Sequence, residues 1–243
     1  MDIPAEMYRR LTPLTKYLSE TLKRPVTLKL SPNMSAAIDE VSNGSVELAY
    51  LTPVAYIKAH AKGEAQLVVK TVTNGQGSFQ LMIVVRQDSP INSIEDLKGK
   101  TFAFGDKAAI LQRAVVVGAG MPLESLGEHK YIGHYDNIAK GVASGDFDAG
   151  ILKDTTAKDW QNQGLRILYS SAPLPPYNIV VSSKVDAELL KQIRQALLGL
   201  NIKNPAQKSV IQALDDEYDG FAPTSDAEYD VVRQLIAPFE AKN

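Results

Sequence analysis

Short apolar runs of strand type alternate with segments of helical periodicity along this chain, and the alternation restricts the folds open to it. Strand-type patterns cover residues 25–30, 46–50, 66–73, 79–86, 101–104, 148–152, 165–169 and 178–182. Helical patterns cover residues 5–22, 35–42, 53–61, 107–113, 186–200, 209–218 and 226–239, with a further helix that ends at residue 142. Strands that alternate with helices predict an α/β protein.

One strand-turn-helix unit lies within Gly99–Ala109. Thr101–Phe104 is an apolar strand that breaks at Gly105-Asp106, and Lys107 opens a segment of helical character. A helix start presents unpaired backbone N–H groups and the positive end of the helix dipole, so together with Lys107 it would attract an anion. In the alternative interpretation, Asp106 only caps the helix and Lys107 is a solvated side chain.

Polar residues follow three of the predicted strands at the point where each strand ends. They are Tyr50 with Thr52, Gly105–Lys107 and Lys153–Thr155. Open α/β sheets bind their ligands at the carboxyl ends of the strands. Two segments, 43–50 and 144–151, also share one pattern, a glycine turn followed by a strand with such a polar end. We therefore predict one small-molecule cleft between two α/β lobes.

Composition and motifs exclude several classes of protein. The formal net charge of −2 gives no basic surface, so no nucleic-acid partner is predicted. The absence of cysteine excludes disulfides and thiolate chemistry. The three histidines stand on separate segments without ligand spacing, so we predict no metal, and no cofactor motif is present. Without a nucleophile elbow or a glycine-rich phosphate loop, the sequence does not predict an enzyme. No apolar run approaches the ~20 residues that span a bilayer.

Several segments taken together resemble one protein family. They are Leu11–Leu18, Glu47–Tyr56, Val84–Ser89, Asp96–Asp106, His134–Asp136, Val142–Ala149, Ser171–Pro175 and Gly220–Tyr229. Over nearly the whole chain, their order and spacing resemble the type-II periplasmic binding proteins of ABC importers, in the branch that binds phosphate, phosphite and phosphonates. No single segment is diagnostic, but the combination is typical of that family.

The resemblance implies an α/β fold of two lobes, each a mostly parallel sheet flanked by helices, that close on a ligand about a hinge of two strands. The first lobe would comprise residues 1–84 and 177–243, and the second residues 85–176. The implied partners are a small anionic ligand and an ABC permease, and we expect a monomer. The implied location is the periplasm or another extracytoplasmic compartment, although no signal-peptide pattern begins at Met1.

The resemblance also implies a set of ligand-binding residues. They are Tyr50, Thr52, Ser78, Phe79, Asp106, Lys107, Ala108, Ala109, His134, Tyr135, Lys153 and Asp154. Most have a purely structural alternative: Thr52 as a helix cap, Tyr50 as a wedged ring at a strand end, and the lysines as surface residues. His134 would donate to an anion or would only cap its helix.

The chain departs from the family pattern in the residues that would hold the ligand. A loop rich in serine and threonine usually follows the Phe-Gly-Asp sequence, whereas Lys107–Arg113 stands here and replaces hydroxyl donors with an ammonium. Lys153 stands where phosphonate binders tend to place an acid that holds a ligand amine, and Phe79 stands at an aromatic-hydroxyl position. Two lysines favour a ligand with one or two negative charges and no ammonium group. The family's opening strand is missing or cut to Met1–Pro4.

The sequence thus predicts a non-catalytic, extracytoplasmic solute-binding protein whose lobes close over a small anion of the phosphate, phosphite or phosphonate class. Two other functions stay open. One is the ligand-sensing domain of a membrane receptor, docked on or fused to a sensor kinase, and the other is an enzyme on the same fold. A sulfonate, an oxyanion such as arsenate or a small carboxylate also stays open as the ligand.

Overall fold

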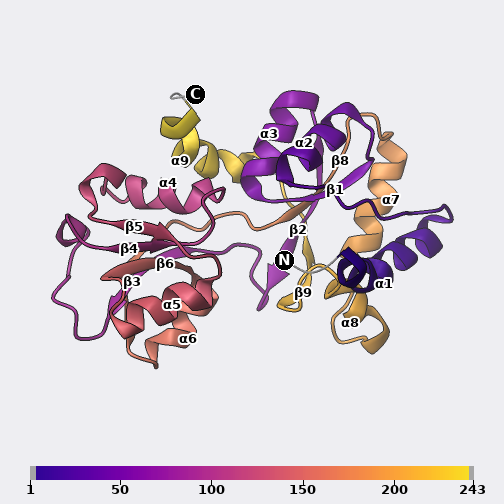
Figure 1. Cartoon of the computed structure of the whole chain (residues 1–243). Helices are drawn as coiled ribbons and strands as arrows, with labels where there is room; N and C mark the ends of the chain where they lie inside the picture. Colours follow the sequence, from indigo (N-terminus) through magenta and orange to yellow (C-terminus); the bar gives the residue numbers. More distant parts are fainter. Residues whose placement is uncertain (1–3, 241–243) are drawn as a thin grey trace. The chain divides into compact units, whose positions relative to one another are not determined.

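The chain forms two compact units (Figure 1). The computed structural model describes residues 4–240, so the expectation about Met1–Ile3 lies outside the described residues. The first unit comprises Met1–Ser78 and Pro175–Asp230, and the second comprises Phe79–Leu174 and Val231–Asn243. The α/β class predicted from the alternation of patterns is confirmed.

The first unit contains a sheet of four strands in the order β1-β8-β2-β9, in which every neighbouring pair is antiparallel. The strands are β1 (Leu48–Leu51), β2 (Gln66–Thr73), β8 (Asn178–Val181) and β9 (Tyr218–Ala222). Its helices are α1 (Pro4–Leu22), α2 (Met34–Asn43), α3 (Pro53–Gly63), α7 (Ala187–Leu198), α8 (Pro205–Ile211) and the short 3-10 helix η3 (Asp226–Tyr229).

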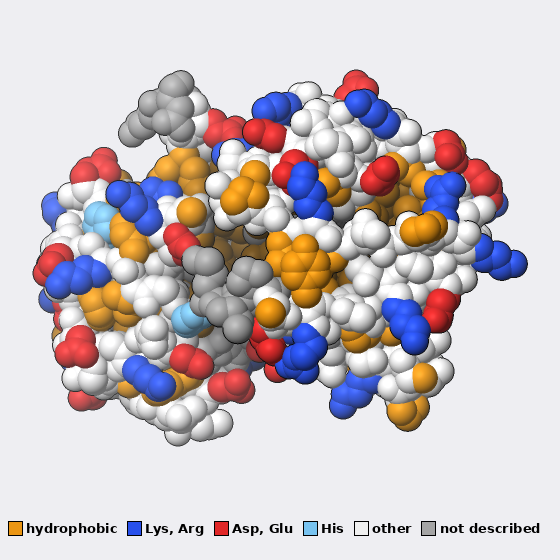
Figure 2. Space-filling model, turned by 45° about the vertical axis from the view of Figure 1, so that its right-hand side comes forward, with side chains coloured by type: hydrophobic (Ala, Val, Ile, Leu, Met, Phe, Trp, Pro, Cys, Tyr) orange, Lys and Arg blue, Asp and Glu red, His pale blue; other side chains and the backbone are white. Residues whose placement is uncertain are grey.

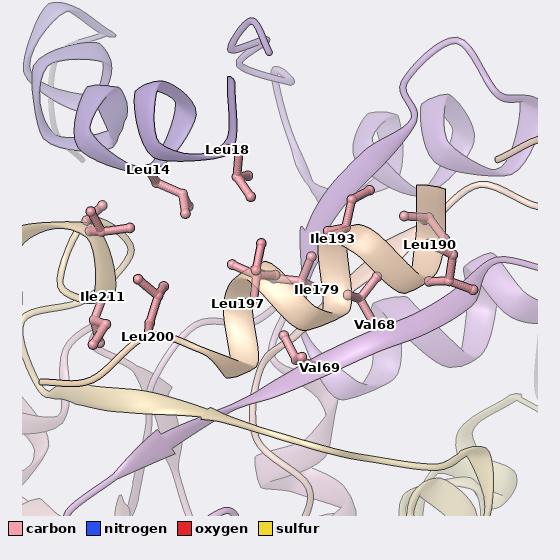
Figure 3. Close-up of a cluster of buried hydrophobic side chains, with 14 of the residues drawn as sticks. Leu14, Leu18, Val68, Val69, Ile179, Leu190, Ile193, Leu197, Leu200 and Ile211 are labelled. Carbon is pink, nitrogen blue, oxygen red and sulfur yellow. The ribbon is translucent and has the colours of Figure 1, made fainter. Parts of the chain in front are cut away.

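Alternation along β8 divides the core of the first unit into two layers. Ile179 and Val181 contribute to one buried cluster, with side chains of α1, α7 and α8 (Figure 3). Val180 faces the other way and contributes to a second cluster with α2 and α3. Successive side chains of a strand point to opposite faces, so a run of apolar residues such as 179–181 requires helices on both sides of the sheet.

The second unit contains a sheet of five strands in the order β5-β4-β6-β3-β7. The strands are β3 (Leu81–Arg86), β4 (Phe102–Phe104), β5 (His129–Tyr131), β6 (Ala149–Lys153) and β7 (Leu165–Ser170). Strand β4 is parallel to β5 and β6, whereas β3 is antiparallel to β6 and β7. Its helices are α4 (Ile110–Gly118), α5 (Tyr135–Ser144), α6 (Asp154–Gln161), α9 (Asp230–Glu240) and the 3-10 helices η1 (Glu95–Leu97) and η2 (Leu123–Ser125).

Close packing of α5 on the second sheet requires a glycine in β6. A Cβ atom at Gly150 would lie 2.5 Å from Cγ2 of Ile138 and 3.1 Å from Cγ2 of Val142, so a side chain there would force the helix away. Ile138 and Val142 are fully buried in the cluster that α5 and α6 form with the sheet. This packing fixes the position at which α5 begins relative to the end of β6.

Several predictions about the fold need correction. Neither sheet is mostly parallel. Every neighbouring pair of the first sheet is antiparallel, and in the second sheet β3 is antiparallel to β6 and β7. Strands β3 and β8, the first strands after the chain enters their units, both run against their neighbours. The chain passes between the units three times, at 78/79, 174/175 and 230/231, rather than through two strands. Residues 25–30 form no strand. The predicted helix 209–218 is helical only at 209–211, the end of α8, and its last residue, Tyr218, begins β9.

The division into units also differs from the expected boundaries at 84/85 and 176/177. Strand β3 crosses the expected boundary, but its pairing with β6 and β7 places all of it in the second unit. Helix α9 was expected in the first lobe and groups with the second unit. It packs on α4, where Leu235 lies so close that a Cβ atom at Gly118 would be 2.9 Å from its Cδ2 atom.

The surface carries charges of both signs. In Figure 2, acidic and basic side chains are interspersed over the face shown, in keeping with the net charge of −2. None of the helices within residues 4–240 is long and apolar enough to cross a membrane.

Candidate functional site

The parallel strands of the second unit bring most of the predicted site residues to one edge of the sheet. Strands β4, β5 and β6 point the same way, so their carboxyl ends share an edge, which we call the ligand edge. Helices α4, α5 and α6 begin shortly after these three ends. The predicted residues at this edge are Asp106, Lys107, Ala108 and Ala109 after β4, His134 and Tyr135 after β5, and Lys153 and Asp154 around the end of β6.

The start of β3 adds Phe79 to the ligand edge. Leu81 pairs with Lys153 in the antiparallel register, and the backbone N–H of Asp154 donates to the carbonyl of Gln80 at 2.9 Å. Phe79 exchanges two backbone hydrogen bonds with Leu174, at 3.0 and 2.8 Å. The residues of the second unit next to the first two crossings, Phe79 and Leu174, are therefore hydrogen-bonded to each other. Ser78, the last residue of the first unit before Phe79, is exposed.

The segment after β4, residues 106–109, differs from the predicted helix start. Helix α4 begins at Ile110 rather than at Lys107, because Asp106 stabilises a turn first. The Asp106 carboxylate accepts the N–H of Ala108 at 2.8 Å, and the Asp106 carbonyl accepts the N–H of Ala109 at 2.9 Å. The N–H groups that were expected to be unpaired are therefore partly paired within the segment, because Asp106 accepts two of them. Asp106 thus forms a turn instead of capping the helix.

Lys107 offers a charge at this turn that is not neutralised. Its side chain is exposed and makes no hydrogen bond or ion pair with any of the described residues 4–240. Its carbonyl accepts a hydrogen bond from Nη2 of Arg113 at 2.9 Å. The ammonium is thus available to an anion that approaches the ligand edge.

The starts of α5 and α6 lie beside this turn. His134 precedes α5, is exposed and makes no side-chain hydrogen bond to the helix start. Lys153 precedes α6 and is half-buried, and the Asp154 carboxylate accepts the N–H of Thr155 at 3.0 Å. Two further helix N-termini therefore point their positive ends to the ligand edge.

Gln112 holds the turn after β4 and was missed in the sequence. Its side chain is 6% exposed, its Oε1 atom accepts the N–H of Gly105 at 2.8 Å, and its Nε2 atom donates to the Tyr135 hydroxyl at 3.5 Å. The carboxamide thus joins the end of β4 to the starts of α4 and α5. The sequence did contain an indication of this role, because Gln112 is the one side-chain amide in the mainly apolar helical segment 110–117, and a buried polar side chain needs hydrogen-bond partners.

Tyr50 and Thr52 lie in the first unit, at the end of β1. Thr52 caps α3 by accepting the N–H of Ala55 at 3.1 Å, which agrees with its structural interpretation. The Tyr50 hydroxyl lies 2.5 Å from the Tyr218 hydroxyl, and its ring stacks on Tyr177 with centroids 4.9 Å apart. Tyr177 is 38% exposed, so this aromatic group reaches the surface of its unit.

The tyrosines of this group remain neutral in physiological conditions. Burial, then the adjacent Tyr218, raises the pKa of Tyr50 far above its ordinary value, and burial raises the pKa of Tyr218 to about 12. Burial, then Asp215, raises the pKa of Tyr177. Neutral phenols donate hydrogen bonds to an anion without repelling it.

No metal centre is formed by the described residues 4–240, since no three histidine or acidic side chains gather there as ligands would. The ligand edge instead carries backbone N–H groups, helix N-termini and lysines, together with the Asp106 and Asp154 carboxylates, which accept hydrogen bonds from neighbouring N–H groups. Such an arrangement attracts and orients a small anion.

The family follows from a match over most of the sequence. Residues 2–229 match the model of the family described as ABC transporter, phosphonate, periplasmic substrate-binding protein. The chain belongs to this family. This binding protein is therefore a substrate-binding component of ABC transporters and not an enzyme, with a small ligand and an ABC permease as the partners that such a component has. The family acts outside the cytoplasm, in agreement with the predicted location.

A named relative matches over most of the chain, and two solved structures share its fold. The phosphate-import protein PhnD of Mycolicibacterium smegmatis is 23% identical over 265 residues, covering 96% of this chain and 83% of the relative. The structure of PhnD1 from Prochlorococcus marinus with methylphosphonate has a TM-score of 0.75 at 17% identity, covering 98% of this chain and 95% of that one. A Xanthomonas citri protein solved with ATP has a TM-score of 0.79 at 21% identity, with 96% and 93% covered. The two structures share the fold of this binding protein.

Proposed function

We propose that this binding protein captures a small phosphorus oxyanion of the phosphonate class at the ligand edge and delivers it to an ABC permease. The observation that carries the proposal is the gathering of three helix N-termini and the unpaired Lys107 ammonium at the ends of β4, β5 and β6. Two named relatives support the ligand class, since one imports phosphate and the other was solved with methylphosphonate.

The proposed roles follow from the chemistry of each group. Lys107 and Lys153 would neutralise the oxyanion, while His134 and the backbone N–H groups of Ala108 and Ala109 would donate to its oxygens. A ligand oxygen would compete with the Asp106 carboxylate for the N–H of Ala108. Binding would therefore require the ligand to displace the Asp106 carboxylate from this N–H or to share it.

Further contacts to the same ligand are proposed for the other predicted residues. In the closed, ligand-bound protein, the hydroxyls of Tyr50 and Thr52 would donate to the ligand, and Ser78 and Phe79 would flank it at the first crossing. The Tyr135 ring and the Asp154 carboxylate would line the ligand edge beside His134 and Lys153. We infer that the protein works as a monomer, and light scattering is expected to give the mass of one 243-residue chain.

A ligand screen by thermal shift tests the proposal. Binding to the folded state raises the melting temperature by mass action, so at least one of phosphate, phosphite and methylphosphonate is expected to raise it. Aminoethylphosphonate is expected to bind more weakly than methylphosphonate, because its ammonium would approach Lys153. Sulfate, arsenate and acetate are the comparison anions. If acetate alone shifts the transition, a carboxylate replaces the phosphorus oxyanion as the ligand, and if no anion does, the ligand edge holds none.

A further inference from the structure

Arg113, on the first turn of α4, contacts three parts of the second unit through its guanidinium. Its Nη2 atom donates to the carbonyl of Lys107 at 2.9 Å. Its Cζ atom lies 5.9 Å from the ring centroid of Tyr131, at the end of β5, and 6.0 Å from that of Phe239, on α9. Arginine is suited to such a position, because its planar group stacks on aromatic rings while its N–H groups donate at the edge.

The guanidinium fixes the orientation of one peptide group in the segment 106–109. In a planar trans peptide the carbonyl and the following N–H point in opposite directions. The carbonyl of Lys107 points to Arg113, so the N–H of Ala108 points away from it, to the Asp106 carboxylate at 2.8 Å. Two charged side chains therefore hold this one peptide from opposite sides, in a segment that has no regular secondary structure of its own.

The guanidinium is held by rings and a carbonyl rather than by an acid. Among residues 4–240 no carboxylate forms an ion pair with Arg113, and its Nε atom is buried without a hydrogen-bond partner. The positive charge is thus not cancelled locally and adds to the field at the ligand edge. Helix α9 contacts the guanidinium through Phe239, and Leu235 of the same helix packs against Gly118.

Helix α9 follows directly from a segment anchored in the first unit. The residue before it, Tyr229, is fully buried in the second cluster of that unit, with Tyr56 and Val180. The third crossing of the chain therefore runs straight into the helix that supports Arg113.

We propose that Arg113 is a positioning residue for the ligand. It orients the Lys107–Ala108 peptide so that the N–H of Ala108 and the Lys107 side chain face the anion, and Phe239 of α9 holds the guanidinium in place. This inference rests on the proposed function for its effect on affinity, but its effect on the segment 106–109 is independent of any ligand.

Amide exchange in the ligand-free protein, followed by NMR, tests the positioning directly. In Arg113→Ala the exchange of the N–H groups of Ala108 and Ala109 is expected to accelerate about tenfold, while exchange in β4 is unchanged. Phe239→Leu, which keeps an apolar side chain but removes the ring, is expected to accelerate the same two groups less. Unchanged exchange of both groups in Arg113→Ala would overturn the proposal.

A matched control comes from Arg166. This residue of the same unit also donates to loop carbonyls, of Ser89 and Ile91, but at the opposite end of the sheet from the ligand edge. Arg166→Ala is expected to leave the exchange of Ala108 and Ala109 unchanged. Acceleration there by both alanine variants would mean general loosening of the unit and would overturn a specific role for Arg113.

Calorimetry with methylphosphonate distinguishes two ways in which Arg113 could affect affinity, by orienting the Lys107–Ala108 peptide or by its positive charge alone. Arg113→Ala is expected to weaken binding about tenfold, and Arg166→Ala to leave it unchanged. Arg113→Lys keeps the charge but not the planar fork, so it is expected to restore only part of the affinity and to leave exchange fast. Full restoration of affinity by lysine would refute positioning in favour of charge alone. If the unaltered protein binds no phosphorus oxyanion, the proposed function fails while the exchange experiment still decides the role of Arg113.

Discussion

Replacement of Lys107 by alanine is expected to weaken anion binding strongly without affecting the fold. The ammonium is exposed and has no partner among residues 4–240, so its removal leaves no buried group unsatisfied and changes the free energy of unfolding by less than ~0.5 kcal/mol. A hydrogen bond to a charged group contributes about 1.5–3 kcal/mol, so loss of the ammonium corresponds to a decrease in affinity of roughly 10- to 150-fold.

Isothermal calorimetry with methylphosphonate at ~0.15 M salt measures this effect, since at that ionic strength distant surface charges are screened and contact charges less so. Lys107→Arg, which keeps the charge, is expected to retain most of the affinity. Lys98→Ala removes another exposed lysine of the same unit, located before β4 rather than after it, and is expected to bind as the unaltered protein does. Equal affinity in Lys107→Ala and Lys98→Ala, within about twofold, would show that the Lys107 ammonium does not contact the anion.

Three further predictions concern stability. Gln112→Leu leaves the N–H at the end of β4 buried without an acceptor and is expected to lower the free energy of unfolding in urea by about 1–3 kcal/mol; an unchanged urea midpoint would contradict this. Tyr56→Phe removes a 2.7 Å hydrogen bond to Asp226 and is expected to destabilise by about 1–3 kcal/mol. Tyr229→Phe removes a buried hydroxyl that lies beside Thr224 and Asn178 but makes no well-aligned hydrogen bond within residues 4–240, and it is expected to cost less than ~1 kcal/mol; the reverse order would show that the Tyr229 hydroxyl is the more strongly bonded of the two. Because burial raises the pKa of Tyr218 and of Tyr229 to about 12, above the unfolded value near ~10, stability is expected to fall as the pH rises from about 10 to 12; denaturant unfolding at these pH values should show a smaller fall in Tyr229→Phe.

The sequence was sufficient for the class of fold and for the residues at strand ends. Alternation of apolar patterns is a local property, so β3, β4, β6 and their following polar residues could be located from it. The direction of the strands could not be predicted, because the pairing of β3 with β6 and of β8 with β1 joins segments distant in sequence, which no local pattern encodes. Strand β9 was not predicted, since the helix expected over 209–218 ends at its first residue and its pairing with β2 joins segments distant in sequence.

The sequence placed the predicted residues at the ends of strands, as the structure has them, but did not predict the contacts among them. The sequence indicated Lys107 and the glycine turn before it. It did not indicate that the Asp106 carboxylate would accept a hydrogen bond from the N–H of Ala108 or that α4 would begin at Ile110, because both depend on the geometry of a few backbone atoms. The contact of Phe239 with Arg113 joins residues far apart in the chain, and only packing of α9 on α4 creates it.

An NMR titration of the ¹⁵N-labelled protein with methylphosphonate shows whether the ligand edge binds a phosphorus oxyanion. We expect saturable, one-to-one changes in chemical shift, largest at the amides of residues 106–109, 134–135 and 153–154. Saturable changes centred elsewhere would place the ligand at another site, and no change at millimolar methylphosphonate or phosphate would contradict the claim that the ligand edge holds a phosphorus oxyanion.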